Sequence, residues 1–62
     1  MKTYNFGGVS IRVIDCANDA VDFRVVEVFG VNGKFVHEIR TSAKGKQAAK
    51  IAYADALRFR YI

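Results

Sequence analysis

Three lysines near the start of a predicted helix are the residues of this chain best suited to bind a partner. Lys44, Lys46 and Lys50 follow Ser42, and the run from Ser42 to Arg60 is rich in alanine. A helix N-terminus carries partial positive charge, so cations there cost about 0.3–1 kcal/mol. A bound anion would reverse that cost, because the free N–H groups, the dipole and the lysines would act together. The pattern predicts a phosphate site, with a solubilising role for the lysines as the alternative.

The net charge of +4 is concentrated in the last third of the chain. Residues 44–62 carry five lysines and arginines and one aspartate, whereas the first 43 residues carry five charges of each sign. A localised basic surface is what an anionic partner requires, although a solvated helix face has the same composition.

Catalysis and metal binding are not predicted by any residue pattern. His37 and Cys16 are single residues far apart in the sequence, and we expect His37 to pair with Glu27 on a neighbouring strand. No phosphate-loop motif is present, and the acidic residues of one loop do not match a calcium site and are better suited to cap turns: Asp15, Asp19 and Asp22. We therefore expect a protein that is not an enzyme and holds no metal or cofactor.

Size and composition predict one small domain, residues 1–62, in the cytoplasm. The chain is 52% hydrophobic and 26% charged, which is typical of globular proteins. Residues 1–6 lack the apolar core of a signal peptide, and no run has the length of a membrane span. Cys16 is the only cysteine, so no internal disulfide is expected.

Strand-like runs and one helical run predict an α+β fold, an antiparallel sheet of three to four strands and a C-terminal helix (β-β-β-β-α). The strands are expected at residues 4–6, 9–15, 21–29 and 35–40, with a loop at residues 16–20. Gly7-Gly8 suggests a two-residue hairpin that places Phe6 opposite Val9 and Tyr4 opposite Ile11.

The second turn decides which side of the sheet is buried. A two-residue loop at Asn32-Gly33 would place Glu27 opposite Glu38, a like-charge pair. A three-residue loop at residues 31–33, with a left-handed Gly33, shifts the register by one. We prefer the second, which sets Phe29 opposite Phe35, Val25 opposite Ile39 and Glu27 opposite His37.

This choice divides the strand residues into two faces. The expected core face holds Tyr4, Phe6, Val9, Ile11, Val13, Phe23, Val25, Phe29, Phe35 and Ile39. The opposite face mixes cations with aliphatic residues, which often marks a binding surface: Ser10, Arg12, Ile14, Arg24, Val26, Val28, Lys34, Val36, Glu38 and Arg40.

The helix is expected to begin near Ser42 as its N-cap, with Thr41 as the alternative, and to pack through small residues. Its core stripe would be Ala48, Ala49, Ile51, Ala52, Ala56 and Phe59. Lys46, Lys50, Leu57, Arg60 and Tyr61 fall on the other side.

The hairpin at residues 31–34, followed by Ser42-Ala43-Lys44-Gly45-Lys46-Gln47-Ala48-Ala49-Lys50, resembles the end of a double-stranded-RNA-binding domain. That family opens a helix with lysines that contact phosphates across the groove. The resemblance implies that Lys44, Lys46 and Lys50 are phosphate ligands.

A second resemblance covers most of the chain. It rests on Tyr4, Gly8-Val9 and Arg12, on Asn32-Gly33-Lys34, and on Ala48-Ala49, Ala52-Tyr53 and Ala56-Leu57-Arg58-Phe59-Arg60. These segments, in the order of strands followed by a helix, are similar to the plant ethylene-response-factor DNA-binding domain and to the arm-binding domains of phage-type integrases. The sheet face of those domains enters the major groove. The resemblance implies base contacts by Arg12 and Arg24 and phosphate contacts by Lys34 and Arg40.

We therefore expect a nucleic-acid-binding module, with DNA somewhat ahead of structured RNA. The alternative is a protein partner. In size and style the chain resembles small phage-encoded inhibitors of host defence, such as anti-CRISPR proteins, which block a protein surface. The interface would then be Ile14, Val26, Val28 and Val36, with exposed Leu57 and Tyr61. Homodimerisation through the same strip is a third interpretation.

Overall fold

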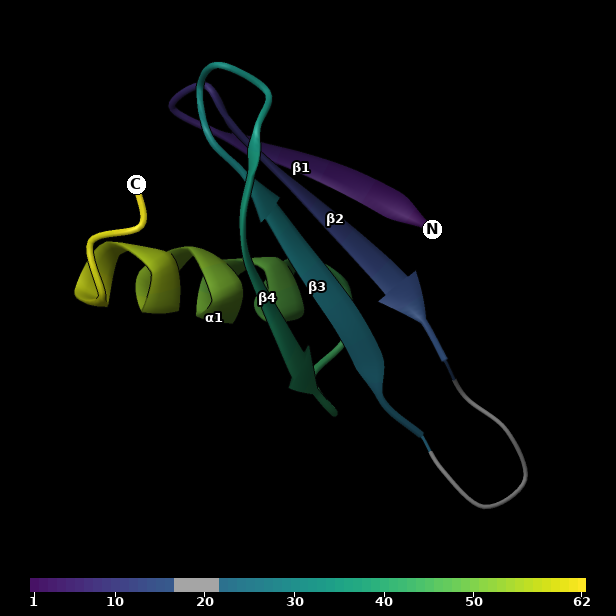
Figure 1. Ribbon diagram of the computed structural model, residues 1–62. Helices are drawn as coiled ribbons and strands as arrows, with labels where there is room; N and C mark the ends of the chain where they lie inside the picture. Colours follow the sequence, from purple (N-terminus) through teal and green to yellow (C-terminus); the bar gives the residue numbers. More distant parts are fainter. Residues whose placement is uncertain (17–21) are drawn as a thin grey trace.

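A computed structural model describes residues 1–16 and 22–62 of the chain and has the expected α+β fold. Four strands are followed by one helix, namely β1 (Lys2–Phe6), β2 (Val9–Asp15), β3 (Arg24–Phe29), β4 (Phe35–Thr41) and α1 (Gly45–Arg58). The strands form one antiparallel sheet in the order β1-β2-β3-β4. Figure 1 shows that α1 lies across one face of this sheet and leaves the other face uncovered.

The first hairpin has the predicted register. Gly7 and Gly8 both have positive φ angles, 57° and 88°, as the favoured two-residue hairpin turn requires. Phe6 pairs with Val9 and Tyr4 with Ile11, so the prediction for β1 and β2 is confirmed. The predicted loop at residues 16–20 and the predicted strand residue Val21 fall largely outside the described residues, and β3 begins at Arg24.

The second hairpin contains the predicted three-residue loop. Gly30 and Lys34 close it through a backbone hydrogen bond of 2.9 Å, and Gly33 has a φ angle of 83°. Phe29 pairs with Phe35, as expected.

Beyond this point the register of the second hairpin differs from the prediction. A bulge follows Phe35, because Val36 has no partner on β3 and His37 pairs with Val28. Two predicted pairs are therefore wrong, since Val25 faces Arg40 instead of Ile39, and Glu27 faces Glu38 instead of His37.

The predicted assignment of β3 is reversed, because β2 pairs Val13 with Val26 and Ile11 with Val28, and the bulge then brings Ile39 of β4 to the same side. Side chains alternate along a strand, so a shift of one residue exchanges the faces. Val26 and Val28 are fully buried under α1, whereas Val25 and Phe29 lie on the uncovered face with Phe35, which is 54% exposed. The predicted core is correct for Val9, Ile11 and Val13 of β2 and for the partly buried Tyr4, Phe6 and Ile39, and it is wrong for Val25, Phe29 and Phe35.

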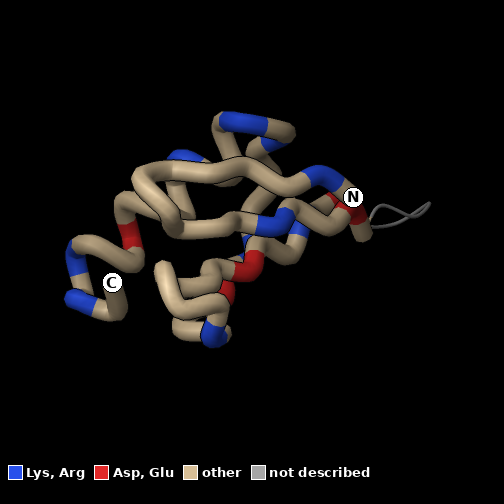
Figure 2. The backbone as a smooth tube through the Cα atoms, turned by 90° about the horizontal axis from the view of Figure 1, so that it is seen from above, with Lys and Arg blue, Asp and Glu red and all other residues tan. Residues whose placement is uncertain are grey.

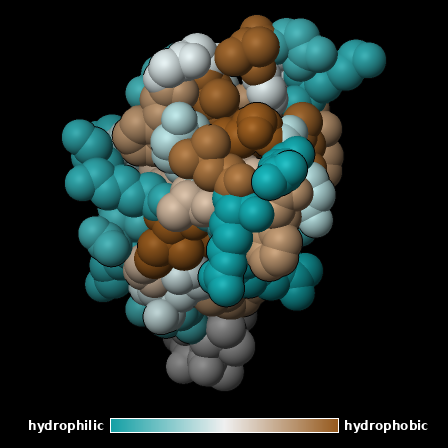
Figure 3. All heavy atoms as spheres, turned by 90° about the vertical axis from the view of Figure 1, so that its left-hand side faces the viewer, coloured by the Kyte–Doolittle hydropathy of each residue, from teal (hydrophilic) through white to brown (hydrophobic). Residues whose placement is uncertain are grey.

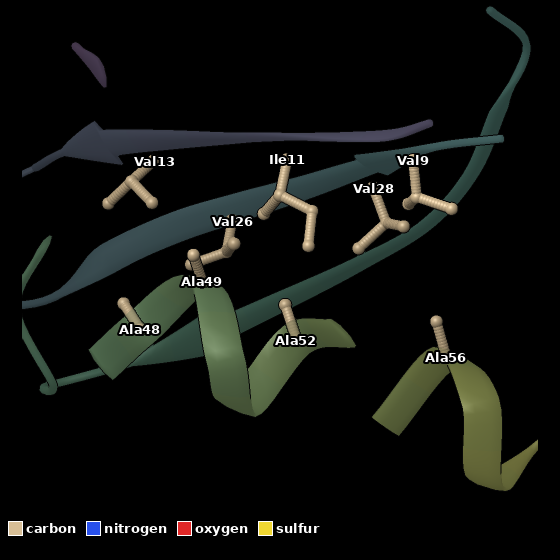
Figure 4. Packing of buried hydrophobic residues seen from close by; sticks show 9 residues of the cluster. All are labelled: Val9, Ile11, Val13, Val26, Val28, Ala48, Ala49, Ala52 and Ala56. Carbon is tan, nitrogen blue, oxygen red and sulfur yellow. The ribbon is translucent and has the colours of Figure 1, made fainter. Parts of the chain in front are cut away.

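Helix α1 packs through alanine, as predicted, but over a narrower stripe. Figure 4 shows Ala48, Ala49, Ala52 and Ala56 pointing at the valines and the isoleucine of β2 and β3, and all four alanines are fully buried. Ile51 is 39% exposed and Phe59 is 56% exposed, so neither belongs to the core stripe that we expected.

Because the small alanine side chains let α1 lie close to the sheet, enlarging one of them should destabilise the fold. We expect Ala52→Leu to lower the free energy of unfolding by about 1–3 kcal/mol through overpacking. The matched control is Ala54→Leu, the same change at an exposed position of the same helix. Urea unfolding followed by circular dichroism measures both, and equal effects would contradict the close packing.

Candidate nucleic-acid interface

The start of α1 carries two lysines, and no acidic side chain among residues 1–16 and 22–62 pairs with either of them. Lys44 is the N-cap residue, its side chain makes no capping hydrogen bond, and the first turn contains no acidic residue. Lys44 and Lys46 are both exposed. This end of the helix therefore combines backbone N–H groups, the positive end of the dipole and two exposed ammonium groups.

The predicted N-cap, Ser42, is two residues before the observed N-cap, Lys44, because the backbone of Ser42 bonds to another strand. The carbonyl oxygen of Ser42 accepts a hydrogen bond of 3.0 Å from Nη1 of Arg24. The hydroxyl group of Thr41 accepts one of 3.1 Å from the N–H of Ala43. These contacts hold the connection between β4 and α1 in a non-helical conformation.

Gly45 brings the helix start against β1. Its φ angle is 55°, and a Cβ atom at this position would lie 3.4 Å from the hydroxyl oxygen of Tyr4. The Nζ atom of Lys2 lies 5.9 Å from the centre of the Tyr4 ring. Sequence reasoning did not connect Lys2 and Tyr4 with the helix start, although the pairing of Tyr4 with Ile11 already placed Tyr4 on the core face.

The exposed arc of α1 continues the basic surface. Lys46 and Lys50 stand one turn apart, and Arg58 lies two turns further along the helix, at about 1.5 Å per residue. The one carboxylate of the helix is turned away from them, because Oδ2 of Asp55 lies 2.6 Å from Nε2 of His37 on β4. Within residues 1–16 and 22–62, the side-chain ion pairs involve Arg12, Arg24 and His37, so none of them neutralises this arc.

Arg24 does not lie on the predicted binding face. It is on the α1 side of the sheet and only 7% exposed. Its guanidinium group bonds to Asp15 at 2.9 Å and to Asp22 at 2.9 Å, in addition to the Ser42 carbonyl. Arg24 is thus a buried cation with an oxygen partner for each of its three guanidinium nitrogens. Its predicted place on one face with Arg12 and Arg40 is wrong.

The remaining sheet cations are partly neutralised. On the uncovered face, Nε and Nη2 of Arg12 donate to Oε1 of Glu27 at 2.9 and 2.7 Å. Lys34 and Arg40 are exposed, but Glu38 lies opposite Glu27 on the same face. Figure 2 shows Lys and Arg segments on several sides of the molecule. The sheet face therefore presents carboxylates beside its cations, in contrast to α1.

The predicted alternative interface is largely internal. Val26 and Val28 are fully buried, and Val36 packs partly against the core. Ile14 alone of the strand residues in that set lies on the uncovered face, half-buried. Leu57 and Tyr61 are exposed as predicted, at 48% and 47%.

An apolar surface does exist at the end of the molecule where the chain terminates. The N–H of Tyr61 donates to the carbonyl of Ala56, and that of Arg60 to the carbonyl of Leu57, with Arg60 left-handed at φ 60°. This Schellman turn directs the last residues back to the sheet, where the Tyr61 ring lies 4.6 Å from that of His37.

A groove separates these last residues from the hairpin of β3 and β4. Its volume is about 320 Å³, and it is lined by Val9, Gly30, Val31, Asn32, Val36, Tyr61 and Ile62. Figure 3 shows hydrophobic surface gathered at this end, with hydrophilic surface on both sides.

The described residues do not suggest a metal site or a membrane span. Residues 1–16 and 22–62 contain no group of three or more potential metal ligands. The helix in this part of the chain is too short and too polar to cross a bilayer. His37 is held between Asp55 and Tyr61, which accounts for its position without a catalytic role. The predicted pairing of His37 with Glu27 is wrong, because Asp55 takes that place.

Comparison with protein-family models, with curated proteins and with solved structures gives no match for this chain.

Because Arg24 is buried and bonded to three groups, its removal should cost stability. We expect Arg24→Met to lower the free energy of unfolding by about 1.5–3 kcal/mol, the value of hydrogen bonds to charged groups. The same change at the exposed Arg40 should stay within about 0.5 kcal/mol. Chemical denaturation at low micromolar concentration compares the two, and a larger loss for Arg40→Met would contradict the assignment of Arg24.

Proposed function

We propose that this chain is a non-enzymatic nucleic-acid-binding module that contacts phosphates through the start and the exposed arc of α1. The observation that carries the proposal is the first turn of α1, where Lys44 and Lys46 are exposed beside uncapped N–H groups and no acidic residue is present. A phosphate at this position would accept hydrogen bonds from the N–H groups and be attracted by both ammonium groups.

The surface favoured for binding is the helix rather than the sheet. Arg24 is buried and Arg12 is bonded to Glu27, whereas a side chain that contacts base edges must be exposed with free donor groups. The lysines of α1 and Arg58 have no such competitor among the described residues. Contacts made by these groups are contacts to phosphate, and they carry no sequence information.

The mechanism is therefore neutralisation of a few phosphates with release of counterions. Four cations, namely Lys44, Lys46, Lys50 and Arg58, lie on the proposed surface. Neutralising about four phosphates gives a slope of about −3.6 for the logarithm of the binding constant against the logarithm of salt concentration on duplex DNA. Binding by one copy of the chain would be weak and nearly independent of sequence, for duplex DNA and structured RNA alike.

A salt titration with duplex DNA and structured RNA tests this proposal. The Lys44→Glu/Lys46→Glu variant should lose at least about tenfold in affinity and reduce the salt slope by about 2 units, because two phosphate contacts are removed. Fluorescence anisotropy with a labelled 20-residue probe of each kind measures the affinity.

The control for that titration is Lys34→Glu/Arg40→Glu, which makes the same charge change at two exposed cations away from α1. It should retain most of the salt slope. Equal losses in the two double variants would show that only net charge matters, and the absence of binding by the unmodified chain in low salt would refute the proposal.

A second candidate function, binding and blocking a protein surface, is favoured by the apolar end of the molecule. Val31 is 78% exposed, Phe59 56%, Leu57 48% and Tyr61 47%. Exposed aromatic residues next to an apolar groove are typical of protein interfaces. This surface lies at the C-terminal end of α1, away from Lys44 and Lys46, so the two candidate functions depend on different residues.

If the protein-binding candidate is correct, capture of a specific partner should resist salt and depend on this end of the molecule. Leu57→Asp should abolish capture in about 0.5 M NaCl, where exposed charge–charge attraction is largely screened. Lys50→Glu is the comparison, because it changes a charge on the same helix. Capture that Leu57→Asp leaves intact would argue against this surface.

A further inference from the structure

The uncovered face of the sheet carries apolar residues that the core does not use. Ile14, Val25 and Phe29 are half-buried although α1 lies on the opposite side, and they are not part of the core cluster. Phe35 is 54% exposed and lies against Phe29, with 5.9 Å between the ring centres. This outer face spans the four strands and has no covering layer. An apolar sheet face usually packs against another layer of structure.

The four charged strand residues of the outer face balance, with Arg12 and Arg40 against Glu27 and Glu38. Arg12 is bonded to Glu27 within the face. Glu38 and Arg40 are both exposed on β4, two residues apart and so on the same side of the strand, and no ion pair within the described residues involves either of them. An anionic partner would meet the carboxylates of Glu27 and Glu38, which makes this face a poor surface for nucleic acid.

A second copy of the same chain fits this pattern. A two-fold interface brings one patch against itself, so the patch must supply both members of each pair. A two-fold axis that runs across the strands, midway between Glu38 and Arg40, places Glu38 of one copy opposite Arg40 of its partner.

We propose that the chain forms a symmetric homodimer through the outer face of its sheet, with Glu38 and Arg40 as reciprocal ion pairs. The two sheets would pack face to face, about 10 Å apart. Four strands at about 4.8 Å spacing and about six residues at 3.3 Å cover roughly 400 Å² before side-chain relief is added. With both copies counted this is about 800 Å², and side-chain relief brings the interface near the lower limit of about 1,000 Å² for specific association, so we expect a weak dimer.

This dimer is independent of the proposed nucleic-acid function, because α1 lies on the other face of each sheet. It would place the two α1 surfaces on opposite outer sides of the assembly. Oligomeric state and nucleic-acid binding can therefore fail separately, and each is measured without the other.

Sedimentation equilibrium of the purified chain, from about 1 µM to 1 mM, tests the dimer. Dissociation with a constant in the micromolar range is expected. Glu38→Arg and Arg40→Glu should each weaken the dimer at least about tenfold, because each places like charges opposite one another twice. The combined variant Glu38→Arg/Arg40→Glu restores opposite charges and should return to within about threefold of the unmodified chain.

Lys46→Glu is the matched control, because it reverses one charge on the α1 side and should leave the dimer unchanged. Circular dichroism verifies that each variant is folded. If the unmodified chain is a monomer at every concentration, the proposal is overturned without any variant being needed. The proposal is also overturned if single charge reversals have no effect, or if the combined variant is as dissociated as the single ones, because the interface would then not use these pairs.

Discussion

One unpaired residue in β4, Val36, determines which side chains of that strand reach the helix side of the sheet. The three-residue loop aligns Phe29 with Phe35, and without a bulge that register would turn Val25, rather than Val26, toward the same side as Ile39. The pairing with β2 sets Arg24, Val26 and Val28 on the inner side of β3, and the extra residue of β4 brings Ile39 to that side beside Val26. The same shift brings His37 to the helix side, where it meets Asp55. The bulge therefore decides which residues of β4 join the core formed by β2 and β3, and which of them join the outer face.

The small core then restricts what the helix can be. The largest fully buried side chains are Ile11, Val26 and Val28, and the helix meets them with alanine alone. A domain of 62 residues buries little apolar surface, so close packing of these few groups carries much of its stability. The buried Arg24 adds bonds to Asp15, to Asp22 and to the Ser42 carbonyl, which join the strand ends to the start of α1. Stability is thus concentrated beneath the inner half of α1, and its outer half is free to carry lysines.

The sequence was sufficient to predict the features that depend on local chemistry. Gly7-Gly8 predicts the register of the first hairpin, because its two-residue turn needs positive φ angles. The alanines predict that the helix packs closely on the sheet. The face of β3 could not be predicted in this way, because Val25, Val26, Val28 and Phe29 are apolar on both sides and periodicity cannot choose between them. The expected register places Arg24 on the outer face together with Val26 and Val28, and it predicts turn caps where Asp15 and Asp22 instead bind Arg24. The Ser42 cap failed because a tertiary contact of its carbonyl outweighs a local preference.

The two faces of the sheet differ in how their charges are compensated, and this difference separates what each can bind. On the outer face the two strand arginines are matched by two strand glutamates, so this face suits a copy of itself better than a polyanion. On α1 the only carboxylate, Asp55, is held by His37, so the lysines act together on an external anion. In the dimer the two α1 surfaces would face away from each other and could not both engage one short straight duplex. Bivalent binding would then require two separate segments or a looped strand, and affinity would rise with the length of the nucleic acid rather than with its sequence.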